Sequence, residues 1–248
     1  EAATPATVAV AIGPGARYRL AAYDVVYAGP RPPAGVELPA GPEPGMPARA
    51  APIADAQARL ITALQDHGRP FARVARRVAA IDRAAKTMIV MLTVDAGPPA
   101  SFGPVAIDGL ARLDPAFVRG KIPWREGERF DRSKLDALRT RLLGLGLFRS
   151  VKVTPADAAG PDGALPVSVA LAEAKHRSVG AGAAFSTSEG FLLDAFWEHR
   201  NLLGAAEKLR VSAQAGTFSQ RMVADFRKPD FRRPGQDLLA KTSAIRTN

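Results

Sequence analysis

The side chains that could do chemistry are few and far apart in this chain of 248 residues. Its histidines are His67, His176 and His199, and no two of them have the close spacing typical of zinc ligands. Ser186 and Ser188 have no histidine and aspartate at a recognisable catalytic spacing. We therefore expect neither a metal site nor nucleophilic catalysis.

Two further motifs have structural interpretations that are simpler than chemical ones. Gly180 and Gly182 are separated by one residue, but no helix pattern follows them as it does in a nucleotide-binding fold. Residues 125–129 alternate basic and acidic side chains around a glycine, which is more typical of a solvated turn than of paired catalytic carboxylates. The absence of cysteine excludes disulfides and thiolate catalysis. The sequence thus predicts a protein that is not an enzyme and has no cofactor.

The composition favours several small folded units. Apolar residues make up 47% of the chain, which is enough for real cores, but aromatics are only 6%. The net charge of +10 fits either an Arg-rich soluble surface or attraction to lipid headgroups. Nucleic acid is a poor candidate, because the basic residues are dispersed and no zinc or helix-turn-helix motif accompanies them. No apolar stretch approaches the roughly 20 residues of a membrane-spanning helix, and residues 1–4 show no signal peptide.

One unit occurs twice. Residues 63–74 and 141–151 both have the pattern of a helix end, a glycine, an aromatic and a strand. A second strand pattern follows each copy, at 87–95 and 165–173. Both copies therefore predict the order strand, helical region, helix, strand, strand, about 80 residues apart. The alternative is a chance similarity between two ordinary α+β modules.

The elements of each copy can be placed along the sequence. In the first copy we expect a strand, a loop rich in Pro and Gly with at most one helical turn, a helix and a hairpin, at 17–28, 29–52, 53–67, 71–80 and 86–95. Gly68 should end the helix in a left-handed conformation. In the second copy, Asp114 and Asp131 should cap two helices. A short apolar segment at 7–12 is a further strand candidate.

After Arg177 the pattern changes to long alternating strands. Val179, Ala181, Ala183 and Phe185 alternate with smaller or polar residues, and three similar segments follow after short turns. Antiparallel segments of about ten residues with one apolar face are typical of a transmembrane β-barrel, which must close so that every backbone group is paired. The alternative is a soluble sheet with one face against a helix layer.

This order of parts resembles a known family. Residues 67–74 are similar to the helix-to-strand junction of POTRA domains, and residues 178–190 with Trp197 and 200–204 are similar to the first hairpin of the associated barrel. The chain thus resembles the POTRA-containing outer-membrane assembly proteins and, within that superfamily, the TamA family. The loop motif that the family carries deep in its barrel is absent.

The resemblance implies an α+β fold of tandem POTRA modules, each β-α-α-β-β, followed by the N-terminal strands of a truncated antiparallel transmembrane β-barrel. The expected domains are a trailing strand of a preceding POTRA module, two POTRA modules and the first barrel strands, at 1–15, 16–97, 98–175 and 176–248. Only about 70 residues follow Arg177, which is enough for four or five strands and too few for a barrel. We therefore expect the chain to be a fragment.

The resemblance also implies a function and a location. It predicts a factor of the Gram-negative outer membrane, with its POTRA modules in the periplasm, that inserts or translocates outer-membrane proteins. The implied partners are unfolded outer-membrane proteins or autotransporters, a TamB-like periplasm-spanning protein and outer-membrane lipid, with no nucleic acid. The alternatives are a two-partner secretion transporter and a purely periplasmic protein-binding module.

The expected mechanism is strand addition, which needs exposed sheet edges and little else. The candidate client- or partner-binding residues on POTRA edges are Phe71, Arg73, Val74, Phe148, Val151 and Val153. The first barrel strand is the candidate seam, because glycine and alanine weaken strand packing. Its residues are Val179, Gly180, Ala181, Gly182, Ala183 and Phe185.

Overall fold

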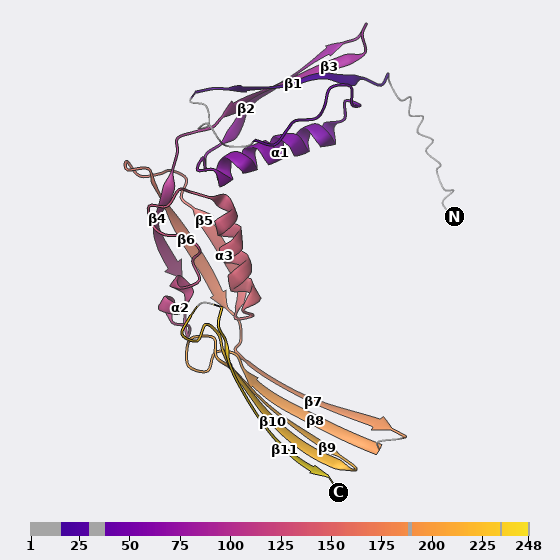
Figure 1. Ribbon diagram of the computed structural model, residues 1–248, viewed down its shortest axis with the longest axis vertical. Coiled ribbons are helices and arrows are strands. Elements are labelled where there is room, and N and C mark those ends of the chain that lie inside the picture. Colours follow the sequence, from indigo (N-terminus) through magenta and orange to yellow (C-terminus); the bar gives the residue numbers. More distant parts are fainter. Residues whose placement is uncertain (1–15, 30–37, 188–189, 234, 248) are drawn as a thin grey trace, which may run out of the picture. The chain divides into compact units, whose positions relative to one another are not determined.

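The computed structural model describes residues 16–29, 38–187, 190–233 and 235–247 (Figure 1). The chain divides into two compact units, residues 1–99 and 100–248. The strand expected at 7–12, and with it the whole segment 1–15, lies outside the described residues. The division into four domains stays a prediction, and each unit is described by itself below.

The first unit is a three-stranded sheet with one helix against it. Its elements are β1 (Arg19–Tyr27), α1 (Ala50–Asp66), β2 (Arg73–Asp82) and β3 (Thr87–Asp95). The strand order is β1-β3-β2, with β1 parallel and β2 antiparallel to β3. The core forms between the helix and one face of the sheet, from Leu20, Ile53, Leu60, Leu64, Ala72, Val90, Leu92 and Val94. One face of β3, with Val90, Leu92 and Val94, is therefore buried in this core.

The described residues of the first module contain one helix, in the order β-α-β-β. The further helical region of the expected β-α-α-β-β order stays a prediction, since residues 30–37 of the 29–52 loop lie outside the described residues. The described residues before α1, 38–49, form only a turn and isolated pairings, and prolines at 39, 42, 44 and 47 remove the N–H groups that a helix needs. The predicted stop at Gly68 is confirmed, since its φ is +84° and the carbonyl of Leu64 accepts from the N–H groups of His67 and Arg69.

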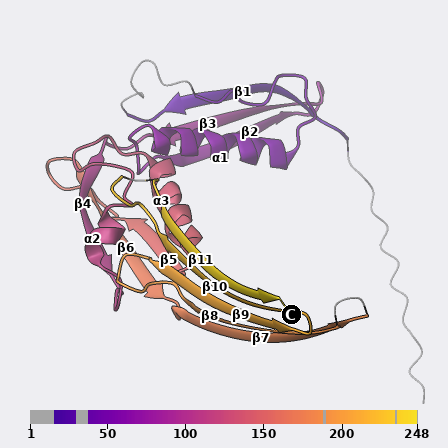
Figure 2. The same ribbon diagram turned by 60° about the horizontal axis from the view of Figure 1, so that its bottom comes forward.

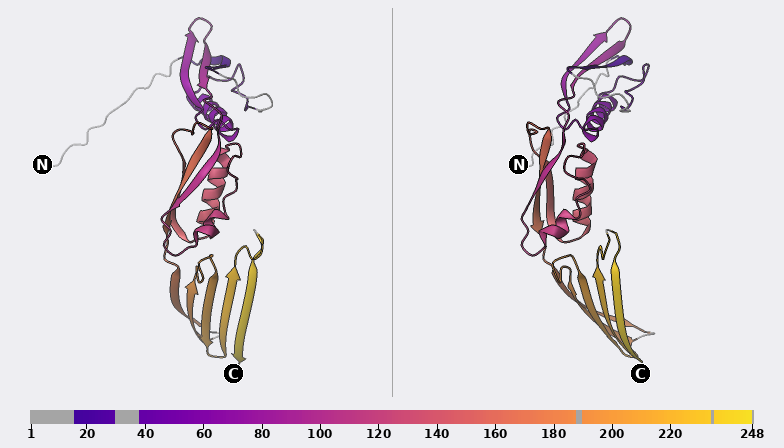
Figure 3. Two further views of the ribbon diagram at one scale, coloured as in Figure 1. Left: turned by 90° about the vertical axis from the view of Figure 1, so that its left-hand side faces the viewer. Right: turned by 60° about the vertical axis from the view of Figure 1, so that its left-hand side comes forward.

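The second module contains two helices and a sheet with the same strand order. Its elements are β4 (Ser101–Asp108), α2 (Pro115–Arg119), α3 (Arg132–Gly144), β5 (Phe148–Pro155) and β6 (Ala164–Glu173), in the order β4-β6-β5. Figure 3 shows α3 lying along one face of this sheet. Both predicted caps are confirmed: Asp114 accepts from the N–H of Ala116 and Asp131 from that of Ser133.

No helix within the described parts of the chain is long and apolar enough to cross a membrane.

The remaining strands form an open antiparallel meander. They are β7 (Arg177–Ser186), β8 (Gly190–His199), β9 (Lys208–Gly216), β10 (Ser219–Lys228) and β11 (Leu238–Thr247). Each pairs with its neighbours in sequence, and together they make one curved sheet (Figure 2). The predicted meander of four or five strands is thus confirmed, while closure into a barrel stays a prediction.

The two faces of this sheet differ in chemistry. Val179 and Phe185 of β7 lie on the face predicted to be apolar and are 77% and 64% exposed. Leu193, Trp197 and Met222 share that face and are also exposed. An exposed apolar surface of this extent is typical of a region that contacts a membrane or another protein.

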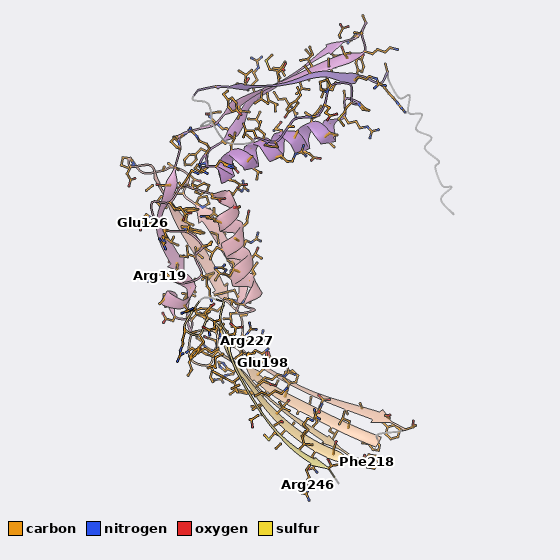
Figure 4. The ribbon with its side chains drawn as sticks, viewed as in Figure 1. Arg119, Glu126, Glu198, Phe218, Arg227 and Arg246 are labelled. Carbon is orange, nitrogen blue, oxygen red and sulfur yellow. The ribbon has the colours of Figure 1, made fainter. Side chains whose placement is uncertain are left out.

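The opposite face carries a row of alternating charges across the strands. Glu198, Arg210, Asp225 and Lys241 stand opposite one another on β8, β9, β10 and β11. A guanidinium nitrogen of Arg210 lies 3.3 Å from Glu198, and the amine of Lys241 lies 3.7 Å from Asp225. In Figure 4, Glu198 and Arg227 mark one end of the sheet, and Phe218 and Arg246 mark the other. Opposite charges across neighbouring strands stabilise this register.

Candidate functional site

The predicted binding residues of the first unit lie at the start of an edge strand. β2 pairs with β3 on one side and with no strand on the other among the described residues. Arg73 is exposed and lies 3.2 Å from Asp95, whereas Val74 is half-buried against the core. Phe71 precedes the strand and is also half-buried. The backbone of β2 is therefore the accessible feature here, with Arg73 beside it.

The predicted residues of the second module lie on another edge strand but point inward. β5 is an outer strand of the order β4-β6-β5. Phe148 and Val151 are buried in the core, and Val153 is half-buried. Their side chains are not available to a partner, so any pairing at this edge would use the backbone of β5. The two sets of residues belong to separate units.

The predicted seam residues all lie on β7, one of the two edge strands of the five-stranded sheet. The structure explains why glycine occupies positions 180 and 182, which the sequence alone did not explain. A Cβ at Gly180 would overlap the ring of Phe196, and one at Gly182 would come within 2.6 Å of a carboxylate oxygen of Asp194. The side chains of β8 thus lean over β7, and the glycines make room for them.

Replacing Gly180 by valine should disturb this strand pair. The new side chain would displace the Phe196 ring, over which the Arg210 guanidinium lies at 4.0 Å from the centroid. We expect a loss of about 1–3 kcal/mol, as is usual for overpacking, with faster hydrogen exchange of β7 and β8 amides. Ala181→Val is the matched control, because Ala181 is on the other face and exposed. Equal exchange in the two variants would contradict the packing argument.

A buried carboxylate organises the loop between β8 and β9. Glu207 is 1% exposed, and its Oε2 accepts from the N–H groups of Leu203 and Ala205 at 3.3 and 3.0 Å. Its Oε1 lies 3.3 Å from the amine of Lys228. Burial alone would raise the pKa of Glu207, but these hydrogen bonds outweigh it and hold the pKa below its usual value. The loop is therefore fixed around one negative charge.

The same loop is fastened to the second module. Asn201 donates to the carbonyl of Arg112 at 3.2 Å and accepts from the N–H of Ala206 at 3.1 Å. The N–H of Asp114 donates to the carbonyl of Gly204 at 3.0 Å. Residues 201–204 and 112–114 thus form a hydrogen-bonded junction within the second unit.

Glu173 fixes residues 111–113, the segment of the second module that contributes to this junction. Its Oε1 accepts from the N–H groups of residues 111, 112 and 113 at 2.8 to 3.1 Å, and its Oε2 lies 3.7 Å from the ring of the buried His176. Burial alone would raise the pKa of Glu173, but the backbone donors and His176 lower it. A carboxylate with three backbone donors is a strong positional restraint.

Sequence reasoning missed these junction residues. It placed 200–204 with the first hairpin of a barrel and assigned no role to Glu173 or Glu207. The available signal was a lone carboxylate next to small or apolar residues, as in Ala205-Ala206-Glu207, since a carboxylate in such a place needs local N–H donors. Across the described ranges, no group of three or more His, Cys, Asp or Glu side chains could hold a metal ion.

Comparison with known proteins assigns the second module. Residues 100–173 match the family model POTRA, described as a surface antigen variable number repeat. These residues contain β4, α2, α3, β5 and β6. Residues 100–173 are therefore similar to POTRA domains, and we refer to them below as the POTRA domain. The junction described above connects this domain to the five-stranded sheet.

Solved structures extend the likeness beyond the POTRA domain at the level of fold. BamA from Haemophilus ducreyi lacking POTRA domains 1–3 aligns with a TM-score of 0.74 and 18% identity, over 82% of this chain and 38% of that one. Haemophilus influenzae BamA POTRA3–5 aligns with a TM-score of 0.52 and 19% identity, over 63% of this chain and 61% of that one. The chain therefore spans less than two thirds of either structure. The TamA assignment stays a prediction, since these structures are of BamA.

Proposed function

We propose that this chain is part of an outer-membrane protein assembly factor of the POTRA-containing superfamily. In this proposal residues 16–97 are a second POTRA module, 98–175 are the POTRA domain with its flanks, and 176–248 are the first strands of an outer-membrane barrel. The segment 1–15 would end a preceding module. The observation that carries the proposal is an open sheet with an exposed apolar face, fastened directly to a POTRA domain.

The apolar face supports a membrane location. Val179, Phe185, Leu193 and Met222 would each expose apolar area to water if that face were solvated. Transfer of apolar area from water is favourable by roughly 25 cal/mol per Å², so contact with lipid chains would stabilise the sheet. The POTRA modules would then lie in the periplasm of a Gram-negative cell, where a TamB-like protein is the proposed periplasmic partner.

The free strand edges support a role in binding unfolded chains. β2, β5 and β7 each have one side without a strand partner among the described residues. An extended client segment can pair with such an edge through its backbone, which makes binding tolerant of the client's sequence. A net contribution of about 0.5–1.5 kcal/mol per hydrogen bond gives weak binding that can be released. The proposed clients are unfolded outer-membrane proteins, autotransporters among them.

The test uses site-specific photo-crosslinking in the intact protein, reconstituted in lipid vesicles. A crosslinker replaces Arg76 on β2 or Ala183 on β7, both exposed, and the matched control replaces Arg139 on α3, also exposed. The probe is a urea-unfolded outer-membrane β-barrel protein diluted into the reaction. We expect crosslinks from Arg76 and Ala183 and none from Arg139.

Two results would contradict the proposal. Crosslinks of equal yield from all three positions would mean that binding is not directed by strand edges. Release of the protein from outer-membrane fractions by alkaline carbonate would favour the purely periplasmic binding module. Each result concerns a separate part of the proposal, since the first tests client binding and the second tests membrane location.

A further inference from the structure

A basic cleft lies within the second unit, beside the junction. It has a volume of about 570 Å³ and is lined on one side by the ends of α2 and α3 and on the other by the loop between β10 and β11. Five cationic side chains line it: Lys121, Arg141, Arg227, Arg232 and Arg233. Only two acidic side chains, Asp230 and Asp237, line the same cleft. Positive charge is therefore in excess.

The two aspartates are already engaged. Asp230 forms an ion pair with Lys121, and Asp237 accepts from Nε of Arg227 at 2.8 Å. Within the described part of the chain, no carboxylate lies within ion-pairing distance of Arg141, Arg232 or Arg233. Arg141 donates to the backbone carbonyl of Lys121 at 3.1 Å, which leaves its charge uncompensated.

Two cations lie close together in the cleft, Lys121 and Arg141, and the ion pair with Asp230 compensates only the first. Lys121 is only 8% exposed, so its ammonium is largely removed from water. Burial lowers the pKa of Lys121, the charge of Arg141 lowers it further, and Asp237 opposes both effects. A bound anion would relieve the unfavourable proximity of Lys121 and Arg141.

The loop that completes the cleft is held in an unusual conformation. Asp230 and Arg232 have φ values of +51° and +66°, a backbone conformation that residues other than glycine rarely adopt. The carboxylate of Asp230 accepts from the N–H of Gly235 at 2.6 Å, and that of Asp237 accepts from the N–H of Asp230 at 3.3 Å. These hydrogen bonds fix the segment that presents Arg232 and Arg233.

We propose that this cleft binds a phosphate group. Guanidinium groups are suited to this, because their planar fork of donors matches two phosphate oxygens at once. Phe117 and Leu145 also line the cleft and could contact carbon atoms attached to the phosphate. The phosphate has two possible sources, an anionic phospholipid headgroup or free phosphate. The lipid source rests on the proposed membrane location, since the apolar face of the sheet resumes at Leu238, directly after this loop.

The experiment measures binding to the intact protein in dodecyl maltoside by calorimetry. The probes are short-chain phosphatidylglycerol, the matching diacylglycerol and inorganic phosphate. The variants are Arg141→Gln and the double variant Arg232→Gln/Arg233→Gln. Arg139→Gln is the matched control, because Arg139 is exposed on α3 but does not line the cleft. The double variant Arg232→Lys/Arg233→Lys keeps the positive charges and removes the planar guanidinium groups that can bind two phosphate oxygens at once.

We expect phosphatidylglycerol to bind, diacylglycerol not to bind, and the Gln double variant to weaken binding about tenfold or more. The Lys double variant should recover part of the affinity, and Arg139→Gln should leave it unchanged. Inorganic phosphate binding as tightly as phosphatidylglycerol would identify free phosphate as the source, and much weaker binding would identify the lipid.

The proposal is overturned if neither phosphate probe binds, or if Arg139→Gln weakens binding as much as the cleft variants do. Thermal unfolding of each variant identifies any that has not folded, and Arg141→Gln then provides an independent test. Failure here is distinguishable from failure of the proposed function. A protein that stays in carbonate-washed outer membranes and crosslinks clients, yet shows no phosphate preference, refutes only the cleft.

Discussion

The variant Glu207→Leu is expected to lose about 3 kcal/mol of unfolding free energy in the second unit. The substitution leaves the N–H groups of Leu203 and Ala205 without their acceptor, and each unsatisfied donor costs about 1–3 kcal/mol. Lys228 also loses its partner but is partly exposed and can be hydrated. Hydrogen exchange of the amides at 201–206 and 112–114 in the intact protein should accelerate, because the junction depends on this loop.

Two comparisons make the Glu207 prediction specific. Glu207→Gln keeps an oxygen acceptor, so it should lose clearly less than Glu207→Leu, and equal losses would contradict the role of the two N–H donors. The second comparison is pH. Because the pKa of Glu207 is lower in the folded than in the unfolded protein, its stabilisation is present above the unfolded value and is lost as pH falls through the folded value. The difference between wild type and Glu207→Leu should therefore shrink in acid.

The variant Phe102→Ala is expected to cost about 3–5 kcal/mol in the POTRA domain. The ring of Phe102 is fully buried, stacks on Trp124 with centroids 4.5 Å apart and lies 5.1 Å from the ring of Phe130. Removing it leaves a cavity between two aromatic rings. In a Trp197→Phe background Trp124 is the only tryptophan, so its emission should shift to the red and its unfolding midpoint should fall.

Phe102→Leu and Phe185→Ala are the controls for this prediction. Leucine fills part of the space and should cost less than alanine. Phe185 is an exposed aromatic on β7, and its truncation should change the stability of the POTRA domain little. A loss in Phe185→Ala that equals the loss in Phe102→Ala would contradict the assignment of Phe102 to the POTRA core.

The elements of the fold could be predicted because their signals are local. Asp114 and Asp131 precede their helices at the N-cap position, and both carboxylates accept the expected N–H group. The alternation from Val179 to Phe185 has a period of two, which sets one face of β7 whatever the strand pairs with. The stretch 29–52 was expected to hold at most one helical turn, and its described residues 38–49, with four prolines, contain no helix.

The candidate site was less predictable because its contacts are distant in sequence. Asn201 meets Arg112 across 89 positions, and Glu173 meets residues 111–113 across about 60. The two alanines before Glu207 indicate a carboxylate that needs local N–H donors, but they do not identify its ion-pair partner Lys228 on β10. The role of the glycines at 180 and 182 in a seam stays a prediction. Their steric reason, the overlap with Phe196 and Asp194, required the register of β7 against β8.

The junction has a mechanical consequence. The POTRA domain is connected to the sheet by the chain itself, through residues 174–176 into β7. It is also connected by the hydrogen bonds of Asn201 and Gly204 to residues 112 and 114 and by the ion pair of Lys121 with Asp230. A body attached at one point can swivel freely, whereas a body attached at several points transmits torque. A force that tilts this domain would therefore twist β7 relative to the loop between β8 and β9. The load would fall first on the pairing of β7 with β8, where Phe196 and Asp194 cover the two glycines.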